Sequence, residues 1–546
     1  MRCLLTYLDR PSARLLLLAL GGILTGLCVV LPVLGPLALV GMTPAGLVIL
    51  RLLSDGRVRK RALYGYGLFY FYSFYLVIFH WFISMYPLEF TGITPGGALV
   101  VVLFAWLGLS LFQALMGGVC FLLGGLLFRS PVISARPLTK PFLFGGIYAV
   151  YEWTQNLGWW GVPWGRLALS QSVYPVGLQT ASLFGSYFVT FLIVTFNLLL
   201  AHLILGLMEG KGSVIRRRLS RGAVISLAAI LLVQYGVGAI LWRSGEESSR
   251  RVTVAAVQGN ISSKWNNDNA DAQCREVYAR YTREAAEAGA TIVVWPETAV
   301  THTIRQEGGN PWYRFCSDLA RQTGVTLLVG GFSVREGGQY NSVFCFLPDG
   351  TLHETVYDKR RLVPFGEFVP FGTLIETLVP PLAELVMSGS DLDAGVGANA
   401  FTLEEGGVGS LICFDSIYDG LIRESVMGGA ELLCLSTNDS WFGSSRALYM
   451  HRAQAQLRAV ESGRYVLRSA NTGITSVINA RGEEVDSIPI QEEGVLVCEV
   501  SLEEGMTLYT RIGNLFVYLW GAILLLLGFS EIGRKIRKRL DNFQKQ

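Results

Sequence analysis

TIVVWPE (residues 291–297) and VGSLICFD (residues 408–415) are short apolar runs, rich in β-branched residues, that end in acidic side chains. Runs of this kind predict buried strands. Three more are VTVAAVQ (252–258), TLLVGGF (326–332) and ELLCLSTND (431–439). Helical patterns lie between them, near residues 268–288, 311–323, 417–428 and 446–462. Strands that alternate with helices predict a layered α/β domain.

Later strands fit residues 464–469, 474–480 and 494–500. The segment NSVFCFLPDGTL (341–352) predicts a hairpin, because an Asp-Gly pair favours the tight turn between two antiparallel strands. The sheets of this domain are therefore expected to be mixed.

The rest of the chain is apolar. Of the 546 residues of the whole chain, 51% are hydrophobic and 16% are charged, whereas soluble domains have roughly 25% charged residues. Because a spanning helix needs about 20 apolar residues, we expect about eight spans. They lie near residues 14–33, 35–53, 62–86, 98–128, 141–157, 173–206, 222–242 and 513–530.

Basic residues cluster in alternate loops, at residues 2–14, 51–61, 129–140, 211–221 and 534–545, whereas the opposite short loops carry only Arg166. The positive-inside rule then places both termini in the cytoplasm. Seven spans before residue 243 then place the α/β domain on the side of the membrane opposite the cytoplasm. Each basic cluster abuts an apolar run and the net charge is only +3, so nucleic-acid binding is not expected.

We predict three parts: a membrane bundle over 1–242, the α/β domain over 243–512, and a final helix with a basic tail over 513–546.

Polar side chains follow several of the predicted strands, where the ligand crevice of a layered α/β domain forms. Glu297 ends TIVVWPE, Cys413 and Asp415 end VGSLICFD, and Asn438, Asp439 and Trp441 lie in STNDSW. A charged loop, YDKRRLVPFGEFVPF (357–371), adds Lys359 and Glu367.

A cysteine thiol needs a base or a cation nearby to act as a nucleophile at neutral pH. Glu297 can remove the thiol proton, and Lys359 can stabilise the thiolate and an oxyanion. Taken singly, Cys413 also fits a core position, Glu297 a turn and Lys359 a solvated surface. The five histidines have no metal-ligand spacing such as HExxH, and no glycine-rich phosphate loop is present, so we expect no metal and no cofactor.

The motifs WPETAV, YDKRRLVPFGEFVP, LICFD and TNDSWFG occur in the order that resembles the nitrilase (carbon–nitrogen hydrolase) superfamily, whose triad is Glu, Lys and Cys. Further likenesses are QGNISSKW (258–265), GVPWG (161–165) and the long segment 451–482. With its apolar half, nearly the whole chain resembles the bacterial apolipoprotein N-acyltransferase family.

This resemblance implies two packed sheets flanked by helices, carried on an eight-helix bundle in the bacterial inner membrane, with the α/β domain on the periplasmic side. It also implies transfer of an acyl chain from a phospholipid to the α-amino group of a diacylglyceryl cysteine at the N-terminus of a lipoprotein. A thioester intermediate links the two half-reactions of this last step of lipoprotein maturation.

Carried over to this chain, the resemblance implies Glu297 as base, Lys359 as oxyanion stabiliser and Cys413 as nucleophile. Supporting positions are Glu367, Asn341 and the aromatic residues Trp265 and Trp441. Three residues depart from the family pattern: Phe414 stands where tyrosine is common, Asp415 where glutamate is common, and Ser262 where a proline often follows the QGNI segment. The shorter Asp415 side chain makes a supporting contact at that position questionable.

Two other functions fit part of the pattern. A membrane-tethered amidase or nitrilase would use the same triad on small carbon–nitrogen substrates, but such hydrolases usually lack a membrane half. A transporter or scaffold with an inactive domain conflicts with the intact triad. The apolar stretch 371–389 is either a lid or membrane-dipping arm, or a connecting loop with a helix.

Overall fold

The computed structural model describes residues 7–88, 93–158, 160–208, 214–245, 247–261, 270–305, 309–335, 337–370, 372, 377, 392–397 and 400–544. The chain divides into two compact units. The first comprises Met1–Leu157, Pro163–Ser244 and Ile512–Gln546, and the second comprises Gly158–Val162 and Gly245–Arg511. Trp265 and nearly all of the predicted lid segment 371–389 lie outside the described residues.

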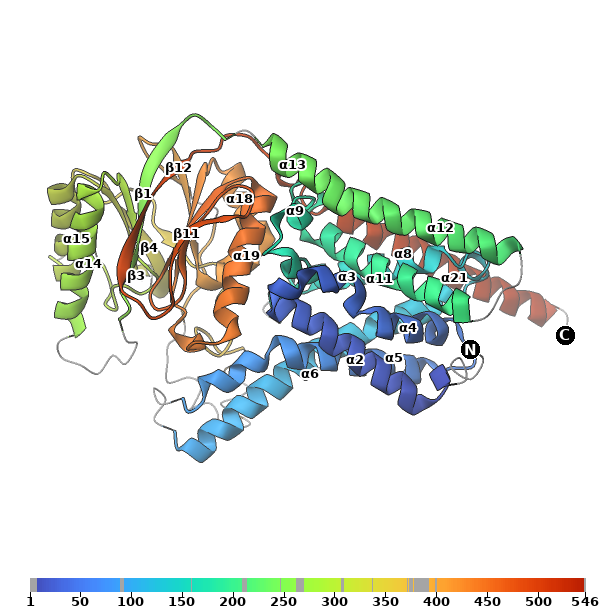
Figure 1. Ribbon diagram of the computed structural model, residues 1–546. Helices are drawn as coiled ribbons and strands as arrows, with labels where there is room; N and C mark the ends of the chain where they lie inside the picture. The colour runs from blue at the N-terminus through green and yellow to red at the C-terminus, as the bar shows by residue number, and fades with distance from the viewer. Residues whose placement is uncertain are drawn as a thin grey trace. The chain divides into compact units, whose positions relative to one another are not determined.

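The first unit is helical (Figure 1). Its helices are α2 (Pro11–Val30), α3 (Ala38–Gly41), α4 (Thr43–Ser54), α5 (Lys60–Ile78), α6 (Pro95–Phe128), α7 (Pro131–Ser134), α8 (Thr139–Thr154), α9 (Pro175–Leu178), α10 (Ala181–Phe184), α11 (Ser186–Met208), α12 (Val214–Leu231), α13 (Gly238–Ser244) and α21 (Leu515–Gln544). A π-helical segment, Leu232–Val237, joins α12 to α13.

Six segments among the described residues are long and apolar enough to cross a membrane. They are Pro11–Val30, Pro32–Ser54, Pro95–Phe128, Ser186–Met208, Ser220–Ser244 and Leu515–Gln544. The predicted spans at 62–86 and 141–157 correspond to α5 and α8, which are not among the six. Helix α8 has 16 residues, and α5 begins with two basic residues and carries several tyrosines.

The predicted span at 173–206 is shorter than expected, because the long helix α11 begins at Ser186. The two short helices α9 and α10 precede it. Pro175 starts α9, and Gly185, with φ of +78°, ends α10. A positive φ is easily adopted by glycine and ends a helical run. The chain therefore turns twice before α11.

Glycines of α2 allow close helix packing, as small residues do in membrane bundles. A Cβ atom at Gly21 would lie 2.5 Å from Cβ of Ala45, and one at Gly22 would lie 2.7 Å from the carbonyl oxygen of Tyr70. The buried Glu152 of α8 accepts hydrogen bonds from the Leu167 amide (2.9 Å) and the Thr190 hydroxyl (2.7 Å). These contacts give Glu152 a packing role within the bundle.

The second unit contains two six-stranded sheets. In spatial order the first consists of β12 (Gly494–Ser501), β1 (Arg251–Gln258), β2 (Ile292–Val294), β3 (Thr326–Arg335), β4 (Gly338–Phe346) and β5 (Tyr357–Asp358). The second consists of β11 (Glu484–Ile488), β10 (Thr475–Ile478), β9 (Tyr465–Ala470), β8 (Leu432–Thr437), β7 (Gly407–Ile412) and β6 (Ala400–Thr402). The central strands β1–β2–β3 and β7–β8–β9 are parallel, and the outer pairs are antiparallel.

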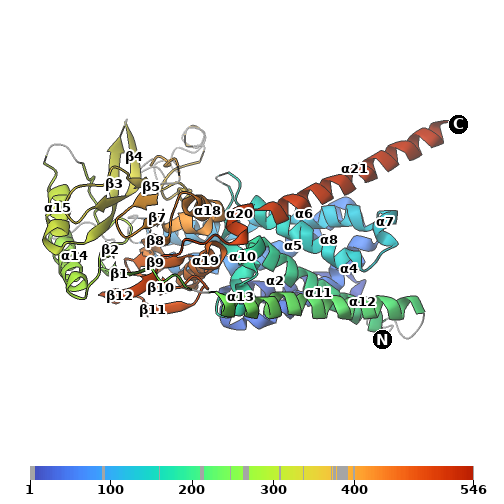
Figure 2. The ribbon, with the colours of Figure 1, turned by 90° about the horizontal axis from the view of Figure 1, so that it is seen from above.

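Helices cover the outer faces of both sheets (Figures 1 and 2). These helices are α14 (Ala270–Glu287), α15 (Pro311–Thr323), α18 (Asp419–Met427) and α19 (Arg446–Ser462), and α20 (Leu508–Ile512) follows β12. The core between the sheets contains Val254 and Leu328 from one sheet and Ile412 and Leu467 from the other, all buried. The prediction of two packed sheets flanked by helices is confirmed.

Two local predictions differ from the structure. The run 291–297 forms a ladder only over Ile292–Val294, because Pro296 has no amide hydrogen to donate. The hairpin predicted within residues 341–352 is also displaced: β4 pairs with the preceding strand β3, with Arg335 opposite Gly338. The Asp-Gly turn at 349–350 does form, but the chain after it makes an isolated bridge from Leu352 to Phe346 in place of a strand.

Candidate active site

Both sheets contribute to one polar cluster. Glu297 follows β2, Lys359 follows β5, and Asn341 lies within β4, all in the first sheet. Cys413 follows β7 of the second sheet. A hydrogen bond of 2.9 Å from the Ser436 hydroxyl to the carbonyl oxygen of Trp295 joins the two sheets next to Glu297.

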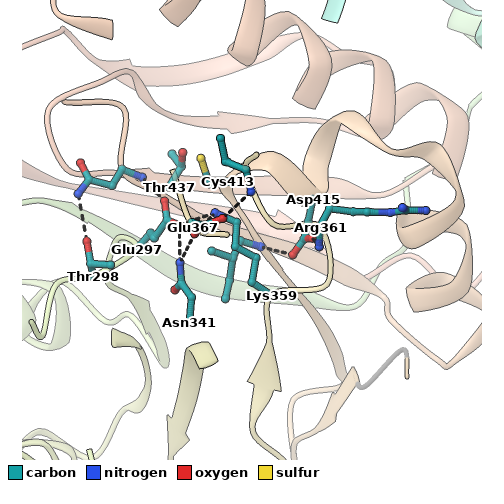
Figure 3. A network of polar contacts seen from close by, with 12 residues as sticks. Glu297, Thr298, Asn341, Lys359, Arg361, Glu367, Cys413, Asp415 and Thr437 are labelled. Carbon is teal, nitrogen blue, oxygen red and sulfur yellow. Dashed lines mark hydrogen bonds and ion pairs between the residues drawn. The ribbon is translucent and has the colours of Figure 1, made fainter. Parts of the chain in front are cut away.

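The Glu297 carboxylate is held on both oxygens. Oε1 accepts hydrogen bonds from Lys359 Nζ at 2.9 Å and Asn341 Nδ2 at 2.8 Å. Oε2 accepts one from the backbone amide of Asn438 at 2.8 Å. Figure 3 shows Lys359 and Asn341 converging on this carboxylate. Glu297 is 6% exposed, so these partners, rather than bulk water, set its orientation.

Lys359 lies between two carboxylates. Its Nζ is 2.8 Å from Oε1 of Glu367 as well as 2.9 Å from Glu297. Burial lowers the pKa of this ammonium group, but the charges of Glu297 and Glu367 raise the pKa more, so that it ends well above its ordinary value. Lys359 is therefore a fixed positive charge. Two of its three N–H donors are used here, and the third can serve an oxyanion.

Glu367 closes the loop that carries Lys359. Its Oε2 accepts a hydrogen bond from the Val363 amide at 2.8 Å, and its Oε1 accepts a second from Asn341 Nδ2 at 3.1 Å. Asn341 thus bridges the two glutamates with one amide nitrogen. The positions of both carboxylates depend on each other and on the single ammonium group between them.

Cys413 begins a short 3-10 helix, Cys413–Ile417, at the end of β7. Its backbone φ is +47°, which is uncommon outside glycine. Burial raises the pKa of the thiol, the Glu297 charge raises it further, and the Lys359 charge lowers it in part. The net pKa lies well above the ordinary value, so the thiol is protonated at neutral pH and needs a base to react.

Asp415 connects the Cys413 segment to the Lys359 segment. Its carboxylate accepts hydrogen bonds from the Tyr357 hydroxyl (2.9 Å) and from the backbone amides of Arg360 (3.2 Å), Arg361 (2.8 Å) and Ile412 (3.2 Å). The shorter side chain thus makes extensive contacts. Burial raises the pKa of Asp415 to about 6, although the Lys359 charge and these hydrogen bonds act in the opposite direction.

Two of the predicted aromatic residues, Phe414 and Trp441, lie in the part of the chain that the structure describes. The Phe414 ring packs edge-on against Tyr418, with centroids 5.4 Å apart. Trp441 lies on a 3-10 turn, Ser440–Phe442, and is 49% exposed. Trp265 lies outside the described residues. The structure therefore gathers Glu297, Asn341, Lys359, Glu367, Cys413 and Asp415, and leaves Trp441 on the surface.

A second buried cluster adjoins Cys413, and Asp439 is its one member among the polar side chains predicted at strand ends. It contains Asp439, His451 and Arg468, each 1% exposed or less. Sequence reasoning noted Asp439 at a strand end but gave no role to the other two residues. Arg468 carried a usable signal, because an arginine within an apolar strand such as YVLRSA requires a buried anion.

The arrangement can perform nucleophilic catalysis. A thiol, a carboxylate able to take its proton and a permanent cation are the components of covalent acyl transfer. Residues 253–508 match the carbon-nitrogen hydrolase family, and residues 21–199 match the N-terminal domain of apolipoprotein N-acyltransferases.

Three relatives that match over two thirds or more of their length point the same way. The chain is 31% identical over 474 residues to a Gloeobacter violaceus protein named apolipoprotein N-acyltransferase, covering 85% of each chain. It is 31% identical over 516 residues to a Methylococcus capsulatus protein of the same name, covering 91% of this chain and 92% of that one. A Geobacter metallireducens protein of that name is 34% identical over 366 residues, with 66% and 68% covered. The chain therefore belongs to the apolipoprotein N-acyltransferase family and is an acyltransferase of the carbon–nitrogen hydrolase superfamily.

Proposed function

We propose that this acyltransferase moves an acyl chain from a phospholipid to the N-terminal α-amino group of a diacylglyceryl-cysteine lipoprotein, through a thioester on Cys413. The observation that carries the proposal is the buried Glu297–Lys359 ion pair at 2.9 Å beside the thiol. It supplies a base and a fixed cation next to Cys413, which follows β7 and interacts electrostatically with both groups (Figure 3). The apolar helices of the first unit would give access to lipid substrates.

In the acylation step, Glu297 takes the thiol proton and Cys413 Sγ attacks the ester carbonyl carbon of the phospholipid. Lys359 donates a hydrogen bond to the oxyanion that forms. The C–O ester bond then breaks, and the proton held by Glu297 passes to the leaving oxygen of the lysophospholipid. The products are an acyl thioester and a lysophospholipid, and no other reactant is consumed.

In the transfer step, the α-amino group of the lipoprotein attacks the thioester carbonyl carbon. Glu297 takes a proton from the amine, and Lys359 again stabilises the oxyanion. The C–S bond breaks and the thiolate recovers the proton. An amide forms, which is more stable than the thioester, so the reaction is driven toward the N-acylated lipoprotein.

We further propose that residues 1–242 and 513–546 form eight spans in the bacterial inner membrane, with both termini in the cytoplasm and residues 243–512 on the periplasmic side. The alternating basic loops support this orientation. Helices α5 and α8 would be the two spans beyond the six that are long and apolar enough alone. Their buried faces, such as Tyr70 and Tyr148, fit spans that pack among other helices.

The test is intact-protein mass spectrometry after incubation with phospholipid, with Cys413→Ala as the matched control. We expect an acyl adduct that hydroxylamine removes, that the control lacks, and that disappears when a diacylglyceryl-cysteine peptide is added. A folded protein that forms no adduct with phospholipid would refute the donor. An adduct that water releases as fast as the peptide would instead favour a hydrolase.

A further inference from the structure

The carbonyl group of Cys413 is held by two side chains. It accepts a hydrogen bond from the Ser416 hydroxyl at 2.7 Å and one from His451 Nε2 at 3.2 Å. The Ser416 oxygen is also 3.1 Å from His451 Nε2. A left-handed backbone at a residue other than glycine persists only where its surroundings hold it. Since φ of Cys413 is +47°, these two contacts maintain the turn that presents the thiol.

His451 is itself anchored from the opposite side of its ring. Nδ1 lies 2.9 Å from Oδ1 of Asp439. Asp439 also accepts hydrogen bonds from the Thr437 hydroxyl at 3.0 Å and from the Arg468 guanidinium group. Arg468 further donates to the carbonyl oxygen of Ile474. The ring is thereby fixed between β8, β9 and the Cys413 turn, and it cannot rotate without breaking buried contacts.

The charged and titratable groups that face His451 come from three elements. Asp439 follows β8, Arg468 lies on β9 with Nη2 3.2 Å from Nδ1, and Cys413 begins the 3-10 helix. Arg468 and His451 hold the pKa of Asp439 well below its ordinary value despite burial, so the group is a carboxylate. A carbonyl oxygen only accepts, so Nε2 must carry a hydrogen to bond it.

The same residues could be read as a metal site, because ligand atoms of Cys413, Asp439 and His451 all lie within 4.8 Å of one another. The Asp439 carboxylate, however, is already paired with the buried Arg468 guanidinium. A metal ion bound to this carboxylate would lie beside the buried Arg468 cation, which would repel it. The hydrogen-bonded network is therefore the better account of the cluster.

We propose that His451 is a positioning residue for acyl transfer, held by Asp439, which fixes the Cys413 carbonyl so that the thiol faces Glu297 and Lys359. The inference rests on the proposed role of Cys413 as the nucleophile. His451 takes no proton from substrate in this proposal. It acts through the backbone of Cys413. Its effect on the reactivity of Cys413 should therefore depend on whether a hydrogen-bond donor occupies the Nε2 position.

Two substitutions separate that donor from the rest of the ring. In His451→Gln the terminal amide nitrogen can take the place of Nε2 and donate to the Cys413 carbonyl. In His451→Asn the shorter amide ends near the Nδ1 position, where it reaches Asp439 but not Cys413. Both variants remove the aromatic ring and leave a neutral amide, so they form a matched pair that differs in reach.

The measurement is the rate of iodoacetamide labelling of Cys413 from pH 6 to 10, read by peptide-resolved mass spectrometry, with the melting temperature of each variant. We expect His451→Gln to label within about threefold of the unaltered protein and His451→Asn to label about tenfold or more slowly, because a small misplacement of a reacting atom is costly. Their melting temperatures should be similar.

Equal labelling of the two variants at similar melting temperatures would overturn the proposal, as would losses of labelling that simply follow melting temperature. Stoichiometric binding of zinc, added as the chloride and lost in His451→Gln, would favour the metal site instead. The labelling assay needs no lipid. If His451→Gln labels faster than His451→Asn but no phospholipid adduct forms, the positioning role would therefore be supported and the proposed acyl donor refuted.

Discussion

The Tyr357 hydroxyl donates a 2.9 Å hydrogen bond to Oδ2 of Asp415. Tyr357 lies two residues before Lys359, and Asp415 lies two residues after Cys413. The contact therefore joins the segments that carry the cation and the thiol, which come from different sheets. It is buried, since Tyr357 is 3% and Asp415 0% exposed, and it sets the separation of the two reactive groups.

The burial of Asp415 makes stability depend on pH. The folded protein holds the Asp415 proton more tightly, with a pKa of about 6, than an unfolded chain does at about 3.9. The stabilisation is fully present below about pH 4 and is lost as pH rises through 6, a change of about 3 kcal/mol.

Asp415→Asn lacks this titration. The melting temperature of the unaltered protein minus that of Asp415→Asn should therefore fall between pH 4 and pH 7. Tyr357→Phe keeps the carboxylate and provides the control, because its melting temperature should retain the pH dependence. A difference that stays constant with pH would contradict the raised pKa.

Glu297→Gln should have opposite effects on turnover and on thiol reactivity. Loss of the base should lower acyl transfer by about 10² to 10⁴-fold. The Glu297 charge raises the pKa of the Cys413 thiol, so removing it should shift iodoacetamide labelling of Cys413 to lower pH. Cys498, which is partly exposed, supplies an internal reference in the same digest. Unchanged or slower labelling at neutral pH would count against this electrostatic coupling.

Lys359→Met should damage both stability and chemistry. It leaves the carboxylates of Glu297 and Glu367 buried without their shared cation, and breaking a buried pair costs about 3–5 kcal/mol. The double variant Lys359→Met with Glu367→Gln removes one of these charges. It should recover part of the melting temperature but none of the turnover, since the oxyanion donor is still missing. Recovered turnover would remove Lys359 from the mechanism.

Gly330 lies directly against the segment that carries Glu297. A Cβ atom there would be 2.2 Å from the carbonyl oxygen of Pro296 and 2.9 Å from Cα of Glu297. Because backbone atoms cannot move aside easily, Gly330→Ala should displace Glu297 and reduce turnover about 100-fold. Gly420→Ala is the control, since its Cβ would have no neighbour within 4 Å. Equal acyl-transfer rates for the two variants would show that the position of Glu297 is not critical.

The α/β architecture could be predicted from the sequence because its strands are apolar and bounded by clear breaks. The helix predicted at 311–323 matches Pro311–Thr323, and that at 446–462 matches Arg446–Ser462. Periodicity alone does not say which strand ends meet. Glu297 and Cys413 were grouped by resemblance to a family, not by spacing. The membrane spans were harder, since proline, glycine and tyrosine interrupt otherwise apolar runs such as 173–206 and 62–86.

The resemblance named Glu367, Asn341 and Asp415 as supporting residues, but the backbone contacts of the site could not be predicted. Asn438 holds Glu297 through its backbone amide, which any residue type could supply. Asp415 reaches its partners although it is one methylene shorter than the family's glutamate, because the Arg360 and Arg361 amides lie close to it. Such contacts depend on the separation of two chain segments, and a linear pattern of residue types does not encode that separation.

Because the proposed site is divided between two sheets, we expect it to be completed only late in the synthesis of the chain. Glu297 and Lys359 are synthesised before Cys413, but the amide of Asn438 that orients Glu297 and the Arg468 anchor come later. A nascent chain that ends before β9 thus contains every proposed catalytic side chain but lacks the Arg468 anchor. We therefore expect acyl transfer by Cys413 to begin only when β9 completes the fold, whereas the thiol of an unfinished chain keeps its ordinary pKa.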